Sequence, residues 1–98
     1  MADWDDLKEF LAVARSESLS GAGKALRLDP ATVGRRISKL EDAMAARLFA
    51  RSPQGYALTE DGGRLLTHAV RVEQAVTEAM EEVKGKGGLT GQVRIGAP

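Results

Sequence analysis

The chain has 98 residues, which is the size of one small domain with a single core. It contains no cysteine, which excludes a disulfide framework and a thiolate zinc site, and no apolar run approaches the roughly 20 residues of a membrane-spanning helix. Met1-Ala2-Asp3 is not the basic start of a signal peptide, so we expect a cytoplasmic protein. No paired nucleophile and base, phosphate loop or metal-ligand spacing is visible, which argues against an enzyme and against a bound metal.

The formal net charge is zero, but the charges are unevenly distributed along the chain. Residues 1–18 carry a net charge of −3, residues 19–58 carry +4 and residues 59–84 carry −3. A basic middle between acidic flanks favours a directed contact with nucleic acid. The alternative is a basic face that is only solvated.

The first predicted helix spans about Asp5 to Arg15. Its apolar residues recur at steps of three and four, which places them on one face of a helix. They are Trp4, Leu7, Phe10, Leu11 and Ala14. Asp3, Asp5 and Asp6 lie at the start of this helix, where the helix dipole favours negative charge.

A second, shorter helix is predicted from Gly21 to Arg27, with Ser20 as its N-cap. Its inward-facing residues are expected to be Ala22, Ala25 and Leu26. Gly21 and Gly23 each cost up to ~1 kcal/mol relative to alanine in a helix. This helix therefore depends on packing against its neighbours.

The third predicted helix begins after Asp29, a favoured N-cap, with Pro30 in its first position. Four apolar residues at steps of four, three and four predict its buried stripe: Val33, Ile37, Leu40 and Met44. The other side carries Thr32, Arg35, Arg36 and Lys39. Only Leu28 and Asp29 separate this helix from the second one, and two short helices joined by so tight a turn are typical of a helix-turn-helix.

Two short extended segments, Arg47–Arg51 and Tyr56–Leu58, flank the turn residues Ser52-Pro53-Gln54-Gly55 and predict a β-hairpin, or wing. Thr59 then caps a long helix that we expect to run to about Lys84, a length of about 39 Å. Glycines from Gly85 onward are expected to end that helix in a flexible stretch. The segment Gln92–Gly96 alternates like a strand.

The predicted fold is therefore mainly α: a winged helix-turn-helix, made of a three-helix core and a short β-hairpin wing, followed by a long linker helix. The winged domain covers residues 1–58, a dimerisation linker helix covers 59–84, and a flexible hinge with the start of a further strand covers 85–98. The major groove of DNA admits an α-helix, and the N-terminal half of such a helix meets the base edges.

The polar face of the third helix, about residues 30–45, is thus predicted to enter the major groove, with the wing on the backbone or in the minor groove. The predicted base-contacting residues are Ala31, Thr32, Arg35 and Arg36. The predicted phosphate-contacting residues, which give affinity without reading sequence, are Ser20, Lys24, Gly34, Lys39, Arg51 and Gln54.

The last helix carries small and apolar residues spaced four, three, four, three and four apart, the period of a helix–helix seam. They are Leu65, Ala69, Val72, Val76, Ala79 and Val83. The alternative is that this stripe packs onto the chain's own three-helix body, yet the helix is too long for so small a body to cover. We therefore expect a homodimer through the linker helix.

Several motifs, in order along nearly the whole chain, resemble those of LysR-type transcriptional regulators. Leu19–Leu26 (LSGAGKAL) and Asp29–Glu41 (DPATVGRRISKLE) resemble the family's helix-turn-helix with its recognition helix. Arg47–Arg51 (RLFAR) and Leu58–Gly62 (LTEDG) resemble the wing and the start of the linker helix, and Gly91–Gly96 (GQVRIG) resembles the first strand of the effector domain.

This resemblance implies a dimeric, sequence-specific regulator that binds double-stranded DNA, with RNA polymerase as a further partner of the full-length protein. It also implies an effector domain, absent from this sequence, that would bind a small-molecule inducer; no cofactor is expected in the chain itself. Gly34 and Pro30 replace polar residues that are common in the family, which leaves more of the readout to the arginines. Ala45 replaces the usual glycine after the recognition helix and costs some strain if its φ is positive.

Other residues are better explained without a site. His68 is expected on the surface, Trp4 in the core and Tyr56 packed under the wing, while Asp5, Asp6 and Glu9 fit a helix start better than a cation site. The competing hypothesis for the whole chain is a non-enzymatic helical module that pairs with a partner protein and whose basic face only keeps it soluble.

Overall fold

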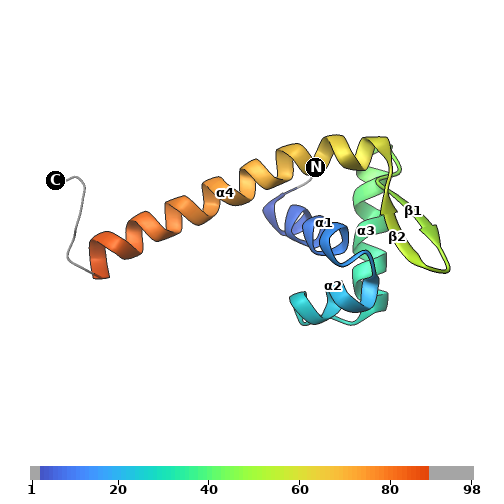
Figure 1. The fold of residues 1–98 in the computed structure, drawn as a ribbon, viewed down its shortest axis with the longest axis horizontal. Coiled ribbons are helices and arrows are strands. Elements are labelled where there is room, and N and C mark those ends of the chain that lie inside the picture. The colour runs from blue at the N-terminus through green and yellow to red at the C-terminus, as the bar shows by residue number, and fades with distance from the viewer. Residues whose placement is uncertain (1–2, 89–98) are drawn as a thin grey trace.

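The computed structural model describes residues 3–88 and shows a compact three-helix body, a hairpin at one end of it, and a long helix that passes along the body and continues well beyond it (Figure 1). The elements in chain order are α1 (Trp4–Ser16), α2 (Leu19–Leu26), α3 (Pro30–Met44), β1 (Phe49–Ser52), β2 (Gly55–Leu58) and α4 (Glu60–Gly88). The two strands pair antiparallel, with Phe49 opposite Leu58 and Ser52 opposite Gly55. The predicted winged helix-turn-helix with a long final helix is thus confirmed. The predicted strand at 92–96 lies outside the described residues.

The core joins the three helices to the hairpin and to the start of α4. Its buried apolar residues are Phe10, Leu11, Val13, Ala22, Val33, Ile37, Leu40, Leu48, Phe49 and Ala69. The Phe49 ring lies 5.4 Å from the Phe10 ring and 5.8 Å from the Tyr56 ring, measured between centroids. The wing is therefore packed into the core, and Tyr56 lies under it as predicted. Trp4 also packs against this cluster, as expected.

The predicted stripe of α3 is correct for three of its four residues. Met44 is exposed, so its assignment to the core was wrong. The physical reason is its position: α3 ends at Met44, and the chain turns away at Ala45 before the body can cover the Met44 side chain.

The N-cap of α2 is Ser18, not Ser20 as predicted. The Ser18 hydroxyl accepts the backbone N–H of Gly21 at 2.9 Å. Glu17 adopts a left-handed conformation with φ 58°, and the chain then becomes extended at Ser18, which is the geometry that an N-cap needs. Ser20 is therefore an exposed residue inside the helix.

The inward face of α2 is formed by Ala22 and Gly23, with Leu26 half-buried beside them. Ala25 is exposed, contrary to the prediction. Around the helix it lies next to Ala22 but on the side away from Gly23 and Leu26, so it is rotated out of the buried face. A Cβ on Gly23 would lie 2.5 Å from the carbonyl oxygen of Leu28, which follows in the turn. Gly23 thus allows the turn of the helix-turn-helix to fold back onto the end of α2.

Ala45 ends α3 in the left-handed region, with φ 54°. A non-glycine residue in this conformation costs roughly 1–2 kcal/mol, which a glycine would relieve. The larger conformational entropy of glycine in the unfolded chain cancels part of that gain. We expect Ala45→Gly to raise the free energy of unfolding by a few tenths of a kcal/mol to about 1 kcal/mol. Ala43→Gly, inside the same helix, should lower it by about 1 kcal/mol. Urea titration of both variants checks the opposite signs, and a loss of stability in both would show that Ala45 is not strained.

The start of α4 is capped as predicted. The Thr59 hydroxyl accepts the N–H of Gly62 at 3.0 Å and donates to the carbonyl oxygen of Arg47 at 2.6 Å. The helix continues to Gly88 rather than ending near Lys84. Glycine lowers helix propensity but keeps the N–H that continues the helical hydrogen bonds, so the glycines after Lys84 were wrongly taken as a stop. In the described part of the chain, no helix is long and apolar enough to cross a membrane.

Only the first part of α4 rests on the body. Ala69 is fully buried and Leu65 packs against the core, whereas Val72 and Val83 are exposed. The first two residues of the predicted seam therefore pack within the chain, as the alternative interpretation held. Of the later residues, Val72, Ala79 and Val83 are exposed and Val76 is half-buried. One residue after Val72, Glu73 of α4 accepts two hydrogen bonds of 2.8 and 2.6 Å from Arg15 of α1, and this contact lowers the pKa of the Glu73 carboxyl.

Candidate nucleic-acid interface

The exposed ridge of α3 begins at the turn after α2. Asp29 occupies the predicted N-cap position, but its side chain makes no capping hydrogen bond. Ala31 and Arg35 are exposed, and Thr32 is half-buried. A guanidinium nitrogen of Arg35 donates to the Thr32 hydroxyl at 3.1 Å, so the structure brings these two predicted base-contacting side chains together on one ridge.

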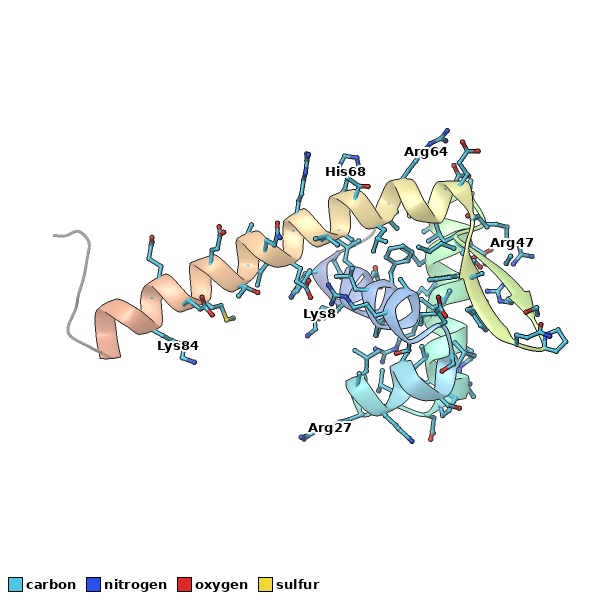
Figure 2. The ribbon with its side chains drawn as sticks, in the orientation of Figure 1. Lys8, Arg27, Arg47, Arg64, His68 and Lys84 are labelled. Atoms are coloured by element: carbon cyan, nitrogen blue, oxygen red, sulfur yellow. The ribbon has the colours of Figure 1, made fainter. Side chains whose placement is uncertain are left out.

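A cleft between α2 and the first turn of α3 extends this surface. Its lining includes Ser20 and Lys24 from α2 and Thr32 from α3. Arg27, at the end of α2, also lines it, and its side chain extends away from the body (Figure 2). Arg27 has no role in the predicted site, although its place at the end of α2, next to the turn, was a usable signal.

Two other predicted phosphate contacts differ in their surroundings. Lys39 is exposed farther along α3. Gly34 faces α2: a Cβ there would lie 3.0 Å from the Leu19 side chain, so a glycine at this position lets the two helices pack closely.

Arg36 is not free on the surface as Arg35 is. Its guanidinium is ion-paired with the carboxylate of Glu9 on α1. The Glu9 side chain is 7% exposed, against 50% for Arg36. Sequence reasoning missed this partner, because the two residues lie 27 positions apart and nothing in the local pattern links them.

The wing carries Arg51 and Gln54. Arg51 donates to the Glu41 carboxylate at 2.8 Å and to the Tyr56 hydroxyl at 3.1 Å, and its guanidinium lies over the Tyr56 ring, 5.2 Å from its centroid. These contacts hold Arg51 between the hairpin and α3. Gln54 is exposed in the hairpin turn.

The hairpin is also anchored to the junction of α1 and α2. The Tyr56 N–H donates to the carbonyl oxygen of Glu17 at 3.0 Å. Gly55 lies beside this contact with φ 133°, and a Cβ there would lie 2.3 Å from the same oxygen. Only glycine fits this conformation and this close approach, so the position of the wing depends on Gly55.

Glu41 is a second buried carboxylate that sequence reasoning missed. It is 4% exposed and accepts the backbone N–H groups of Leu48 and Phe49 at 2.9 and 3.2 Å. Burial alone would raise its pKa, but these two N–H groups and the Arg51 guanidinium together bring the pKa below its ordinary value. Glu41 thus stays charged and ties the wing to α3. Its place beside Leu40, one turn after Ile37, was the available signal.

The remaining polar side chains form no competing site in the part of the chain that the structure describes. Arg64 and His68 extend from α4 away from the body, so His68 is on the surface as predicted (Figure 2). Among residues 3–88, no group of histidine, cysteine and acidic side chains could hold a metal ion. The candidate interface is the polar surface formed by α2, α3 and the wing.

A three-helix body with a tight turn between α2 and α3, a polar exposed ridge on α3 and a hairpin beside it defines a winged helix-turn-helix protein. Residues 4–63 match the family described as "Bacterial regulatory helix-turn-helix protein, lysR family". The chain belongs to this family, which confirms the resemblance seen in its motifs, and it carries a LysR-type DNA-binding domain of transcriptional regulators.

Individual relatives agree with this assignment. The chain is 40% identical over 92 residues to the uncharacterized HTH-type transcriptional regulator YdcI of Escherichia coli K12, covering 93% of this chain and 30% of that protein. It is 36% identical over 94 residues to the HTH-type transcriptional regulator DgdR of Burkholderia cepacia, covering 96% and 32%. The chain thus spans about a third of the length of these relatives.

A solved structure shares the fold. The crystal structure of a CbnR DBD–DNA complex superposes with a TM-score of 0.77 at 26% identity, covering 88% of this chain and 99% of that one.

Proposed function

We propose that this chain binds double-stranded DNA sequence-specifically as a homodimer, with α3 in the major groove and the wing on the backbone or in the minor groove. The observation that carries the proposal is the ridge of α3, where Arg35 is exposed and bound only to the Thr32 hydroxyl among the described side-chain contacts. A helix with such a ridge fits the major groove. The likeness to a DBD solved with DNA supports the same role.

In this proposal Arg35 reads a guanine through two hydrogen bonds, while Ala31 and the Thr32 methyl group contact a thymine methyl. Phosphate contacts come from Lys24, Lys39 and the wing-tip Gln54, together with Ser20 and Arg51. Gly34 is left out because it packs against α2 and offers no donor. Arg36, which the sequence predicts as a base contact, is left out of this proposal because its guanidinium is bound by Glu9.

The proposed dimer forms through the exposed part of α4, where Val72, Val76, Ala79 and Val83 continue the seam period beyond the body. The exposed Met80 widens this apolar strip. A second copy of the chain fits it because an identical strip is self-complementary across a two-fold axis. Such a dimer presents two α3 helices to a near-palindromic site.

The relatives are about three times as long as this chain, so we extend the proposal to a full-length regulator. There, an additional domain would bind a small-molecule inducer, and RNA polymerase would be a further partner. Such a regulator would act in the cytoplasm, where the bacterial chromosome lies.

The salt dependence of DNA binding tests the proposal. The affinity of the chain for duplex DNA should fall steeply as the salt concentration rises, because each phosphate contact releases counterions. Fluorescence anisotropy with a labelled random-sequence duplex, at several salt concentrations, measures this slope. The absence of binding at low salt would overturn the proposal in favour of a protein–protein interaction module.

Arg35→Ala should reduce the preference for a selected binding sequence over a random duplex by about 1–3 kcal/mol, because one bidentate base contact is lost. Lys39→Ala should weaken binding to both duplexes equally and serves as the matched control on the same helix. Selection of bound sequences from a random pool supplies the specific duplex. An equal loss on both duplexes for Arg35→Ala would exclude Arg35 as a base reader.

A further inference from the structure

Arg35 and Arg36 are neighbours in sequence, but the structure places them in different surroundings. Successive residues of an α-helix project about 100° apart. Arg35 lies on the exposed ridge with Thr32, whereas Arg36 points to the flank that faces α1 and pairs with Glu9. One arginine is thus bound to a neutral hydroxyl and the other to a carboxylate.

We infer that Glu9 is a positioning residue that holds Arg36 against α1 and so removes its charge from the DNA-binding surface. This inference rests on the proposed DNA binding and deepens it, because it concerns how many basic groups of α3 are available to the duplex. It gives the two arginines separate roles: Arg35 binds DNA, and Arg36 fastens α1 to α3.

The burial of Glu9 is the first reason why the pair should persist on DNA. Its carboxylate is almost completely covered and lies next to the core residue Phe10, while Arg36 is half exposed. A buried carboxylate that loses its partner is left charged in a poorly solvated place, which is costly. A DNA phosphate would therefore have to compete for Arg36 with the Glu9 carboxylate, which stays buried from water when Arg36 leaves it.

The surroundings of the pair act in the same direction. The hydrogen bond from Arg36 to Glu9 is the main reason why the Arg36 pKa is raised. Asp5 and Asp6 lie close enough to add a smaller effect in the same direction. A groove between α1 and α3 is lined by these acids together with Glu9, Arg36 and Lys39. The acids of this groove repel the phosphate backbone, so the groove marks the edge of the DNA-binding surface, with Lys39 on the border between the two.

The inference predicts how the salt dependence of binding responds to substitution. Each phosphate contact contributes about 0.9 to the slope of log K against log salt. Arg36→Gln should leave the slope of wild type unchanged. Glu9→Gln frees the guanidinium of Arg36 and should raise the affinity for a random duplex at low salt and steepen the slope by about 0.9. In the double variant the slope should return to that of wild type.

The probe is the labelled random-sequence duplex, with Lys24→Gln, a change at a proposed phosphate contact, as the control that should flatten the slope by about 0.9. Thermal unfolding checks that each variant is folded; if Glu9→Gln is not, Arg36→Gln alone decides. A flatter slope for Arg36→Gln, or an unchanged slope for a folded Glu9→Gln, overturns the inference while leaving the proposed function intact. A wild type without salt-dependent binding overturns both.

Discussion

Replacing Glu41 with alanine is expected to lower the free energy of unfolding by about 2–4 kcal/mol, because a buried donor that loses its acceptor costs about 1–3 kcal/mol. The Glu41 carboxylate accepts two backbone N–H groups at the entry to the wing, and both belong to buried core residues, Leu48 and Phe49. It also binds Arg51. Urea titration followed by circular dichroism measures the loss.

Asp42→Ala is the matched control for Glu41→Ala. Asp42 is the next residue on α3, is also acidic and is exposed, so its removal should change stability by less than about 0.5 kcal/mol. If Glu41→Ala is no less stable than Asp42→Ala, then the carboxylate does not hold the wing and the hydrogen bonds at Leu48 and Phe49 contribute nothing net.

The same carboxylate makes the stability depend on pH. The pKa of Glu41 is lower in the folded chain than its ordinary value of 4.5, so its stabilising effect is complete above that value and is lost as the pH falls through the folded-state pKa. The stability difference between wild type and Glu41→Gln should therefore be constant near neutral pH and shrink below pH 4.5. A difference that stays constant down to the acid transition would mean that folding does not change the pKa of Glu41.

The order of the elements was predictable because their boundaries are marked by local chemistry. Pro30 after Asp29 and Thr59 at the start of α4 place two helix starts correctly, since both signals lie in residues next to the helix start. Ser20 failed as a cap for a non-local reason. Two serines stand two positions apart, and the left-handed turn at Glu17, whose carbonyl oxygen binds the wing, selects Ser18.

The candidate site was predictable on the exposed ridge and less so beneath it. Amphipathic periodicity places Thr32, Arg35 and Lys39 opposite the buried stripe of α3, and the structure agrees. Periodicity places Glu41 one turn after Ile37, but it cannot identify the partners of Glu9 and Glu41, because these come from other elements. It also treats Ala69 and Val83 alike, although the body covers one and leaves the other in solvent.

That difference along α4 leads to the second large effect. Val72→Glu combined with Val83→Glu should convert the proposed dimer to monomers, because each charge would be buried against an apolar partner at a cost of several kcal/mol. Both positions are exposed in the single chain, so neither substitution should disturb the three-helix body. Sedimentation should then show a dissociation constant at least about 100-fold higher than that of wild type. Gln74→Glu with Thr77→Glu adds the same charge to the opposite face of α4 and should leave the dimer intact.

The loss of the dimer should also be visible in the helix and on DNA. Beyond Glu73 the helix has no body to pack on, and an isolated helix of this length is marginal in water, so helicity should fall together with dimerisation. A dimer on a near-palindromic site binds its second half-site at high effective concentration, an advantage of about 10²–10⁴ that monomers lack. Affinity for the full site should fall accordingly, while affinity for a single half-site stays the same. If the wild type is monomeric and fully helical, α4 is stable without a partner. The proposed homodimer is then wrong.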